Sequence, residues 1–170
     1  MRFVNYQPAQ VIFYNQAGDV VLDEPSLVAI RPYPNPPNLH TADGDIIAMG
    51  EDAREAHKTP GHEDVLVGSF LHNNVVADFG LAKRFIRIMV KKFAKLEKRM
   101  FIRKPLVALC IPKELTEVEH SAYRALFARI GRPASGRPHS TNCALLIEKT
   151  YQEARAEIPK NYSIIVEIKI

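Results

Sequence analysis

The chain has 170 residues, of which 46% are hydrophobic and 25% are charged, and its net charge is +4. This length and composition fit one globular domain and exclude a disordered or fibrous protein. The opening residues become polar too early for a signal peptide, and no apolar stretch approaches the roughly 18 residues of a membrane span. We therefore expect a soluble protein of the cytoplasm, whose two cysteines form no disulfide framework.

Short apolar segments begin the chain. They predict strands at 2–6, 10–15, 20–22 and 27–30. Ala17-Gly18-Asp19 predicts a hairpin turn between the second and third of these strands. Four prolines between Arg31 and Asp45 exclude regular structure, so we expect a long surface loop there.

Small elements are predicted next. A strand at 45–49 ends at Gly50, and the following residues, 51–57, predict a short helix that Pro60-Gly61 stops. Two further strands are expected at 65–67 and 75–77.

A long amphipathic helix is predicted from about residue 80 to 99. Its expected apolar stripe consists of Leu81, Phe85, Ile88, Phe93 and Leu96. Most basic residues lie off this stripe, in a block of ten cations opposed only by Glu97: Lys83, Arg84, Arg87, Lys91, Lys92, Lys95, Lys98, Arg99, Arg103 and Lys104. Such a local positive field favours partners that carry phosphate, either lipid headgroups or nucleic acid.

Strands and helices alternate in the rest of the chain. Strands are predicted at 106–111, 143–147 and 161–170, and helices at 116–130 and 148–158. Thr116 and Glu119 form a capping box at the start of the first of these helices, whose expected apolar side consists of Val118, Ala122, Leu126 and Ile130. In the last strand, one predicted face carries Ile164, Val166, Ile168 and Ile170, and the opposite face carries Ile165, Glu167 and Lys169. The order of elements predicts an α/β fold with a mixed sheet flanked by helices.

Several stretches together resemble bacterial actin homologues of the MreB type, the rod shape-determining family. These stretches are Asp23–Ile30, Gly50–Ala53 with Lys58–Gly61, Asn74–Phe79, Val107–Pro112 with Leu115–Glu119, and Leu146–Glu148. The resemblance covers nearly the whole chain and implies a ribonuclease H-like, actin-like ATPase fold. It implies that residues 1–160 form the first domain, with a small subdomain inserted at about 31–76. The strand at 161–170 would correspond to the start of a second domain.

The same resemblance implies two phosphate loops, and both are degenerate here. In the first loop, Asn5 replaces the metal-side carboxylate, Gln7 replaces a glycine, and Pro8 has no amide to donate. In the second, Glu167 falls at the aspartate position and Lys169 at the first glycine. Glu148 matches the water-orienting glutamate, although a glutamate at a strand-to-helix junction more often complements the helix dipole. We therefore predict no catalytic residue, no bound cofactor and no metal.

Beside the long helix, the resemblance implies a loop that dips into the membrane. Met100, Phe101 and Ile102 would supply the apolar contacts, flanked by the basic residues Lys98, Arg99, Arg103 and Lys104. The alternative is that Phe101 and Ile102 open the next strand and pack in the core. Nucleic-acid binding is disfavoured because no aromatic side chains are interleaved on an exposed sheet face.

The predicted function is an MreB-like assembly or binding module of the cell-shape cytoskeleton that has lost nucleotide binding. Its expected partners are other copies of itself or an actin-like filament, with an anionic membrane surface as a further possibility. One alternative is a residual ATPase completed by a second chain. Another is a peripheral membrane adaptor without a role in filaments. The terminal strand 161–170 must pair either on its own sheet or with a second chain, because an exposed apolar edge favours association.

Overall fold

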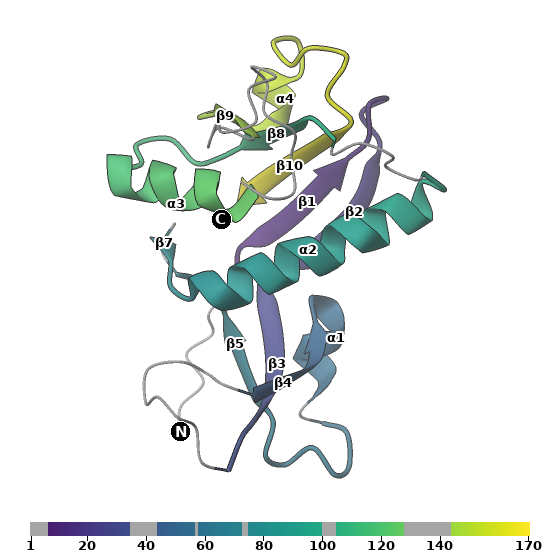
Figure 1. Cartoon of the computed structure of the whole chain (residues 1–170), viewed down its shortest axis with the longest axis vertical. Coiled ribbons are helices and arrows are strands. Elements are labelled where there is room, and N and C mark those ends of the chain that lie inside the picture. The colour runs from purple at the N-terminus through teal and green to yellow at the C-terminus, as the bar shows by residue number, and fades with distance from the viewer. Residues whose placement is uncertain (1–6, 35–43, 57, 73–74, 100–104, 128–143) are drawn as a thin grey trace.

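The computed structural model describes residues 7–34, 44–56, 58–72, 75–99, 105–127 and 144–170 (Figure 1). The strands are β1 (Gln10–Tyr14), β2 (Val20–Pro25), β3 (Leu27–Pro32), β4 (Gly44–Met49), β5 (Leu66–Ser69), β6 (Leu71–His72), β7 (Val75–Val76), β8 (Val107–Cys110), β9 (Ala144–Ile147) and β10 (Ile164–Lys169). The helices are α1 (Glu51–Ala56), α2 (Phe79–Leu96), α3 (Glu117–Phe127) and α4 (Tyr151–Ala154). Of these elements, the sequence did not predict β6, which has only two residues. The strand predicted at 2–6 lies outside the described residues.

The main sheet has five strands in the order β2-β1-β10-β8-β9. β1 is antiparallel to both β2 and β10, whereas β10, β8 and β9 are parallel to one another. This arrangement confirms the predicted α/β fold with a mixed sheet.

The terminal strand β10 lies in the middle of this sheet. Its residues pair with β1 from Gln10↔Lys169 to Tyr14↔Ile165, and on the other side with β8. We expected this strand to pair either on its own sheet or with a second chain, and in the structure it pairs on its own sheet. Its predicted alternation is confirmed within β10, because Ile164, Val166 and Ile168 join one core cluster while Ile165 joins another. Ile170, predicted on the first of these faces, follows the strand and is 66% exposed. The division into domains at residue 160 stays a prediction.

Helices cover both faces of the main sheet. On one face, α2 and α3 pack on alternate residues of the strands, including Phe13, Leu109 and Val166. Figure 1 shows α2 lying across this sheet. On the other face, the short helix α4 packs on Ile12, Ala108 and Ile165. β8 is therefore buried on both sides, as its continuous apolar sequence predicted.

The strands that follow β2 in the sequence form a smaller sheet of three strands, in the order β4-β3-β5. Helix α1 packs beside this sheet (Figure 1). Ser26 separates β2 from β3, and its hydroxyl group lies 2.7 Å from that of Ser69. Glu24 connects this smaller sheet and α1 to the main sheet, because its carboxyl group accepts hydrogen bonds from the Glu51 amide and the Lys92 amine, both at 2.9 Å.

The predicted stripe of the long helix is partly wrong. Phe85 and Phe93 are buried, but Ile88 is 45% exposed and Leu96 is 54% exposed. The stripe that packs on the sheet consists of Ala82, Phe85, Ile86, Met89 and Phe93. The observed stripe lies on one side of the helix, because its residues recur at the helical spacing of three and four. Ile88 lies outside that side and faces solvent.

Two further predictions need correction in the last part of the chain. The helix predicted at 148–158 is only α4, because Thr150 caps its N-terminus and Glu148 therefore precedes it. The capping box at Thr116 and Glu119 is confirmed, but Val118, predicted on the apolar side of α3, is exposed. No helix in the described ranges is long and apolar enough to cross a membrane.

Candidate functional site

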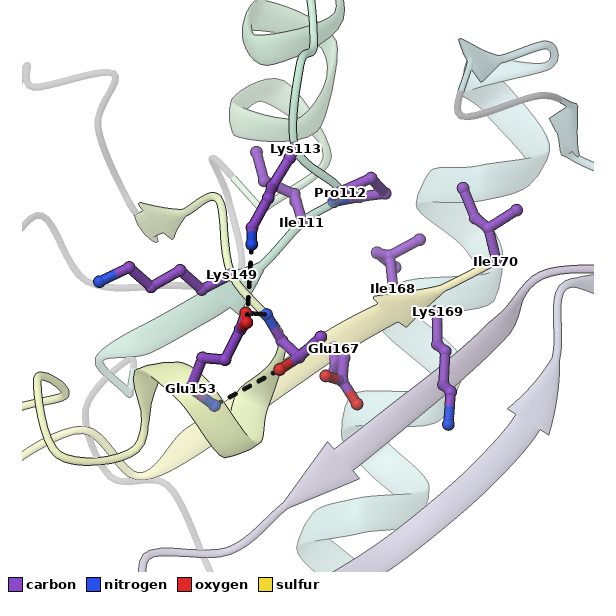
Figure 2. Close-up of a pocket in the computed structure, with 10 residues that line it drawn as sticks. Ile111, Pro112, Lys113, Lys149, Glu153, Glu167, Ile168, Lys169 and Ile170 are labelled. Atoms are coloured by element: carbon purple, nitrogen blue, oxygen red, sulfur yellow. Dashed lines mark hydrogen bonds and ion pairs between the residues drawn. The ribbon is translucent and has the colours of Figure 1, made fainter.

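A pocket of about 500 Å³ lies at the carboxyl ends of the parallel strands β8 and β10 and beside α4 (Figure 2). In open α/β sheets, ligands bind in the crevice at this edge. Its lining residues are Ile111, Pro112, Lys113, Lys149, Thr150, Glu153, Glu167, Ile168, Lys169 and Ile170. This pocket is therefore the candidate site.

Glu167 is the buried polar residue of the pocket, with only 7% of its surface exposed. One carboxyl oxygen accepts a hydrogen bond from the Tyr14 hydroxyl at 3.0 Å, and the other accepts one from the Tyr151 amide at 2.5 Å. The rings of Tyr14 and Tyr151 stack with their centroids 3.9 Å apart. These contacts join β1, β10 and α4 around a single carboxyl group.

The hydroxyl of Tyr14 is well suited to act as a donor. Burial raises the pKa of Tyr14 well above its ordinary value, and the hydrogen bond to Glu167 raises it further. Tyr14 therefore stays protonated over the physiological pH range and keeps donating to Glu167.

The first turn of α4 satisfies its own backbone amides. The Thr150 amide donates to the Glu153 carboxyl group at 3.1 Å, and the Glu153 amide donates to the Thr150 hydroxyl at 3.4 Å. The hydrogen bond from the Thr150 backbone, together with Lys113 3.5 Å away, lowers the pKa of Glu153. Figure 2 shows Lys113 reaching down to Glu153 across the pocket.

Glu148, the one candidate for a catalytic role, does not line this pocket. Its carboxyl oxygen lies 2.7 Å from His120 Nε2, so it bridges the β9–α4 turn to the first part of α3. Glu148 is therefore not among the lining residues of the pocket that contains Glu167, although the resemblance places both in one site.

The residues of the predicted first phosphate loop are partly described. Gln7 and Pro8 immediately precede β1, whose first residue, Gln10, pairs with Lys169. This segment therefore lies at the same edge of the sheet as the pocket, although neither residue lines it. Asn5 lies outside the described residues.

The predicted membrane contact is also only partly described. Lys98 and Arg99 are exposed after the end of α2, and Lys98 has a φ of 52°, a left-handed conformation that breaks the helix. Met100, Phe101, Ile102, Arg103 and Lys104 lie outside the described residues. In the described segments, no group of three histidine, cysteine or acidic residues could hold a metal ion.

Sequence reasoning placed Glu167 at the phosphate-loop position but missed Tyr14, Tyr151 and His120. Two tyrosines so distant in sequence give no pattern that links them. The one usable signal is the alternation of β10, which puts a carboxyl group among apolar residues and so requires hydrogen-bond donors nearby.

Three comparisons with known proteins fit this architecture. A family model described as MreB/Mbl protein matches residues 5–134. The cell shape-determining protein Mbl of Bacillus cereus is 32% identical over 124 residues, which cover 72% of this chain and 33% of Mbl. The cell shape-determining protein MreB of Escherichia coli is 29% identical over 118 residues, which cover 68% of this chain and 31% of that protein.

A crystal structure of MreB5 of Spiroplasma citri bound to AMPPNP has the same fold. It superposes with a TM-score of 0.59 at 23% identity, over 88% of this chain and 39% of MreB5. The chain thus spans about a third of the length of its curated relatives. Because the family model matches well over half of the sequence, this chain belongs to the MreB/Mbl family.

Proposed function

We propose that this chain is an MreB-like assembly module of the cell-shape cytoskeleton that does not bind nucleotide. The observation that carries the proposal is Glu167, whose carboxyl group takes up the donors at the pocket where a nucleotide phosphate would need them.

Phosphate groups are usually held by backbone amides, which approach closely where glycines leave room. The pocket is lined at the end of β10 by Ile168, Lys169 and Ile170, and no glycine is among its lining residues. The amides of Thr150, Tyr151 and Glu153 already donate to side chains of this chain. These occupied amides support the loss of a phosphate site.

The charged groups that line the pocket are mixed. Two carboxyl groups, Glu153 and Glu167, lie among three lysines, Lys113, Lys149 and Lys169. Two of these lysines already have a carboxylate partner, because Lys113 lies 3.5 Å from Glu153 and Lys149 pairs with Glu157. The proposal therefore rests on the occupied amides and not on the charge of the pocket.

Isothermal titration with Mg-ATP tests the proposal. We expect no binding heat at millimolar nucleotide, with Spiroplasma citri MreB5, crystallised with AMPPNP, as the positive control. Micromolar affinity would contradict the proposal. An ATPase rate that rises with the square of protein concentration would instead support the alternative of a residual ATPase completed by a second chain.

Peripheral membrane contact is a second candidate function, favoured by the exposure of Lys98 and Arg99 beside Met100, Phe101 and Ile102. Vesicles that contain anionic lipid should float the chain in a density gradient, and neutral vesicles should not. We expect Phe101→Ala/Ile102→Ala to remain in the dense fraction. Equal flotation of this variant and the wild type would show that the loop does not insert.

A further inference from the structure

The outer side of α2 carries a straight row of basic side chains. Arg84, Arg87, Lys91 and Lys95 are spaced by three, four and four residues, opposite the stripe that packs on the sheet. We call these four residues the basic ridge. All four are exposed, and the row is about 17 Å long at the ordinary rise of an α-helix.

The basic ridge has no counter-charge within the described part of the chain. None of its four side chains makes an ion pair there, whereas Lys92, on the flank of the same helix, binds Glu24 at 2.9 Å. Like charges three or four residues apart destabilise a helix slightly. The ridge therefore weakens the isolated chain, and a partner with the opposite charge would remove this cost.

The region of the smaller sheet and α1 carries charge of the opposite sign. Exposed carboxyl groups gather on α1 and the segment before β5; we call them the acidic face and define it as Glu51, Asp52, Glu55, Glu63 and Asp64. The ion pairs that it makes within the described residues are with neighbouring cations of the same region, namely Arg54, Lys58 and Arg31. Five carboxyl groups against these three cations leave the acidic face negative.

The two surfaces lie on elements that Glu24 connects. The Glu24 carboxyl group accepts hydrogen bonds from both the Glu51 amide and the Lys92 amine. No ion pair in the described residues joins the ridge to the acidic face. Two copies of the chain, however, could bring the ridge of one against the acidic face of the other.

Each surface also offers an apolar residue. Ile88 is 45% exposed beside the ridge, and Leu66, which follows Asp64 closely in the chain, is 61% exposed. An apolar centre with a charged rim is typical of contacts between proteins. The acidic face offers both the opposite charge and an apolar residue of its own, so the two surfaces together favour a second copy of this chain as the partner.

We propose that the basic ridge is a docking surface for a second copy of this chain, which binds through its acidic face. This inference rests on the proposed assembly function and assigns the surfaces that carry it. Because the two surfaces are different, the contact is heterologous, and it repeats into rings or filaments unless each pair closes on itself. Its charges are exposed, so salt should weaken it.

Sedimentation velocity with charge-reversal variants tests this assignment. The ridge variant is Arg84→Glu/Lys91→Glu/Lys95→Glu, and the face variant is Asp52→Lys/Glu55→Lys/Glu63→Lys. At about 50 mM salt, where screening is weak, we expect the wild-type mass to rise with concentration, and at about 500 mM salt we expect it to fall. Each variant alone should associate at least about tenfold more weakly.

Mixing the two variants is the decisive arm, because their charges are complementary again. An equimolar mixture should recover wild-type association, and far-UV circular dichroism should show that each variant is folded. If one triple variant fails to fold, the pair Lys91→Glu and Asp52→Lys replaces it.

The possible failures are distinguishable. If the wild type associates but the variants do so equally well, the ridge assignment is wrong and the assembly function stands. The ridge assignment also fails if the mixture does not recover. A wild type that stays monomeric at every concentration would overturn both. If that monomer instead binds anionic vesicles and the ridge variant does not, the basic ridge is a lipid-binding surface.

Discussion

One face of the five-stranded sheet lies under α2 and α3, whereas the other lies under α4 and Tyr162. On the first face, large apolar side chains of the helices pack on the sheet. Examples are Phe85, Phe93 and Tyr123, all of which are fully buried. On the second face, a helix of only four residues covers β1, β8 and β10. Such a helix buries too little apolar surface to be held by packing alone.

The second face compensates with hydrogen bonds. Glu167 accepts bonds from Tyr14 and Tyr151, and the tyrosine rings stack on each other. Stability on the first face should therefore depend on side-chain volume, whereas on the second it should depend on donors and acceptors. Substitutions on each face can test this difference.

The largest effect is expected from Phe85→Ala on the first face. Phe85 packs on Phe70 with ring centroids 4.7 Å apart and has no exposed surface. Its truncation should lower the free energy of unfolding by about 3–5 kcal/mol, because the surrounding core cannot fill the cavity. Urea denaturation measures the loss. Ile88→Ala on the same helix is the matched control and should change stability by less than about 0.5 kcal/mol.

The second face should lose less with Glu167→Ala. This change leaves the Tyr14 hydroxyl and the Tyr151 amide buried without their acceptor. We expect a loss of about 1.5–3 kcal/mol in the same denaturation assay. Glu167→Leu is the informative comparison, because it restores apolar volume but no acceptor. A stability equal to that of the wild type would show that packing, not hydrogen bonding, holds α4.

Tyr14→Phe should cost about 1 kcal/mol at neutral pH, because it removes one hydrogen bond and keeps the ring. It should also change the response to alkali. Since the pKa of Tyr14 is higher in the folded chain than in the unfolded one, its contribution is complete below pH about 10 and declines as pH rises further. The variant should therefore lose less stability than the wild type at alkaline pH. Parallel slopes of urea midpoint against pH would contradict this.

The fold was largely predictable from the sequence, because the periodicity of buried residues is strong in its main elements. β8 and β10 appear as an apolar run and an alternating strand, and both predictions are confirmed. The errors fall where packing decides between neighbouring residues. Ile88 and Ile86 are equally apolar, and only the direction of the sheet turns Ile86 inward.

The candidate site was less predictable. Its key interactions connect residues 153 and 16 positions apart, from Glu167 to Tyr14 and Tyr151. Such contacts follow from the central place of β10 in the sheet, which no local pattern specifies. The sequence did show where Gln7, Pro8 and Lys169 depart from the phosphate-loop pattern of the family.

The smallest expected difference between the two faces is how readily each one opens locally. The reactivity of the buried Cys110 thiol measures the opening of the second face. This thiol is 1% exposed on the second face, and burial raises its pKa to about 12. In a Cys143→Ser background at pH about 8, iodoacetamide should therefore react only when α4 detaches or the chain unfolds. Glu167→Ala should accelerate this reaction about tenfold for each 1.4 kcal/mol that it removes from the second face. Phe93→Leu, on the first face, should accelerate it only when denaturant makes global unfolding the dominant route. If both variants change the rate equally without denaturant, the two faces open together and the short helix α4 is not separately held by Glu167.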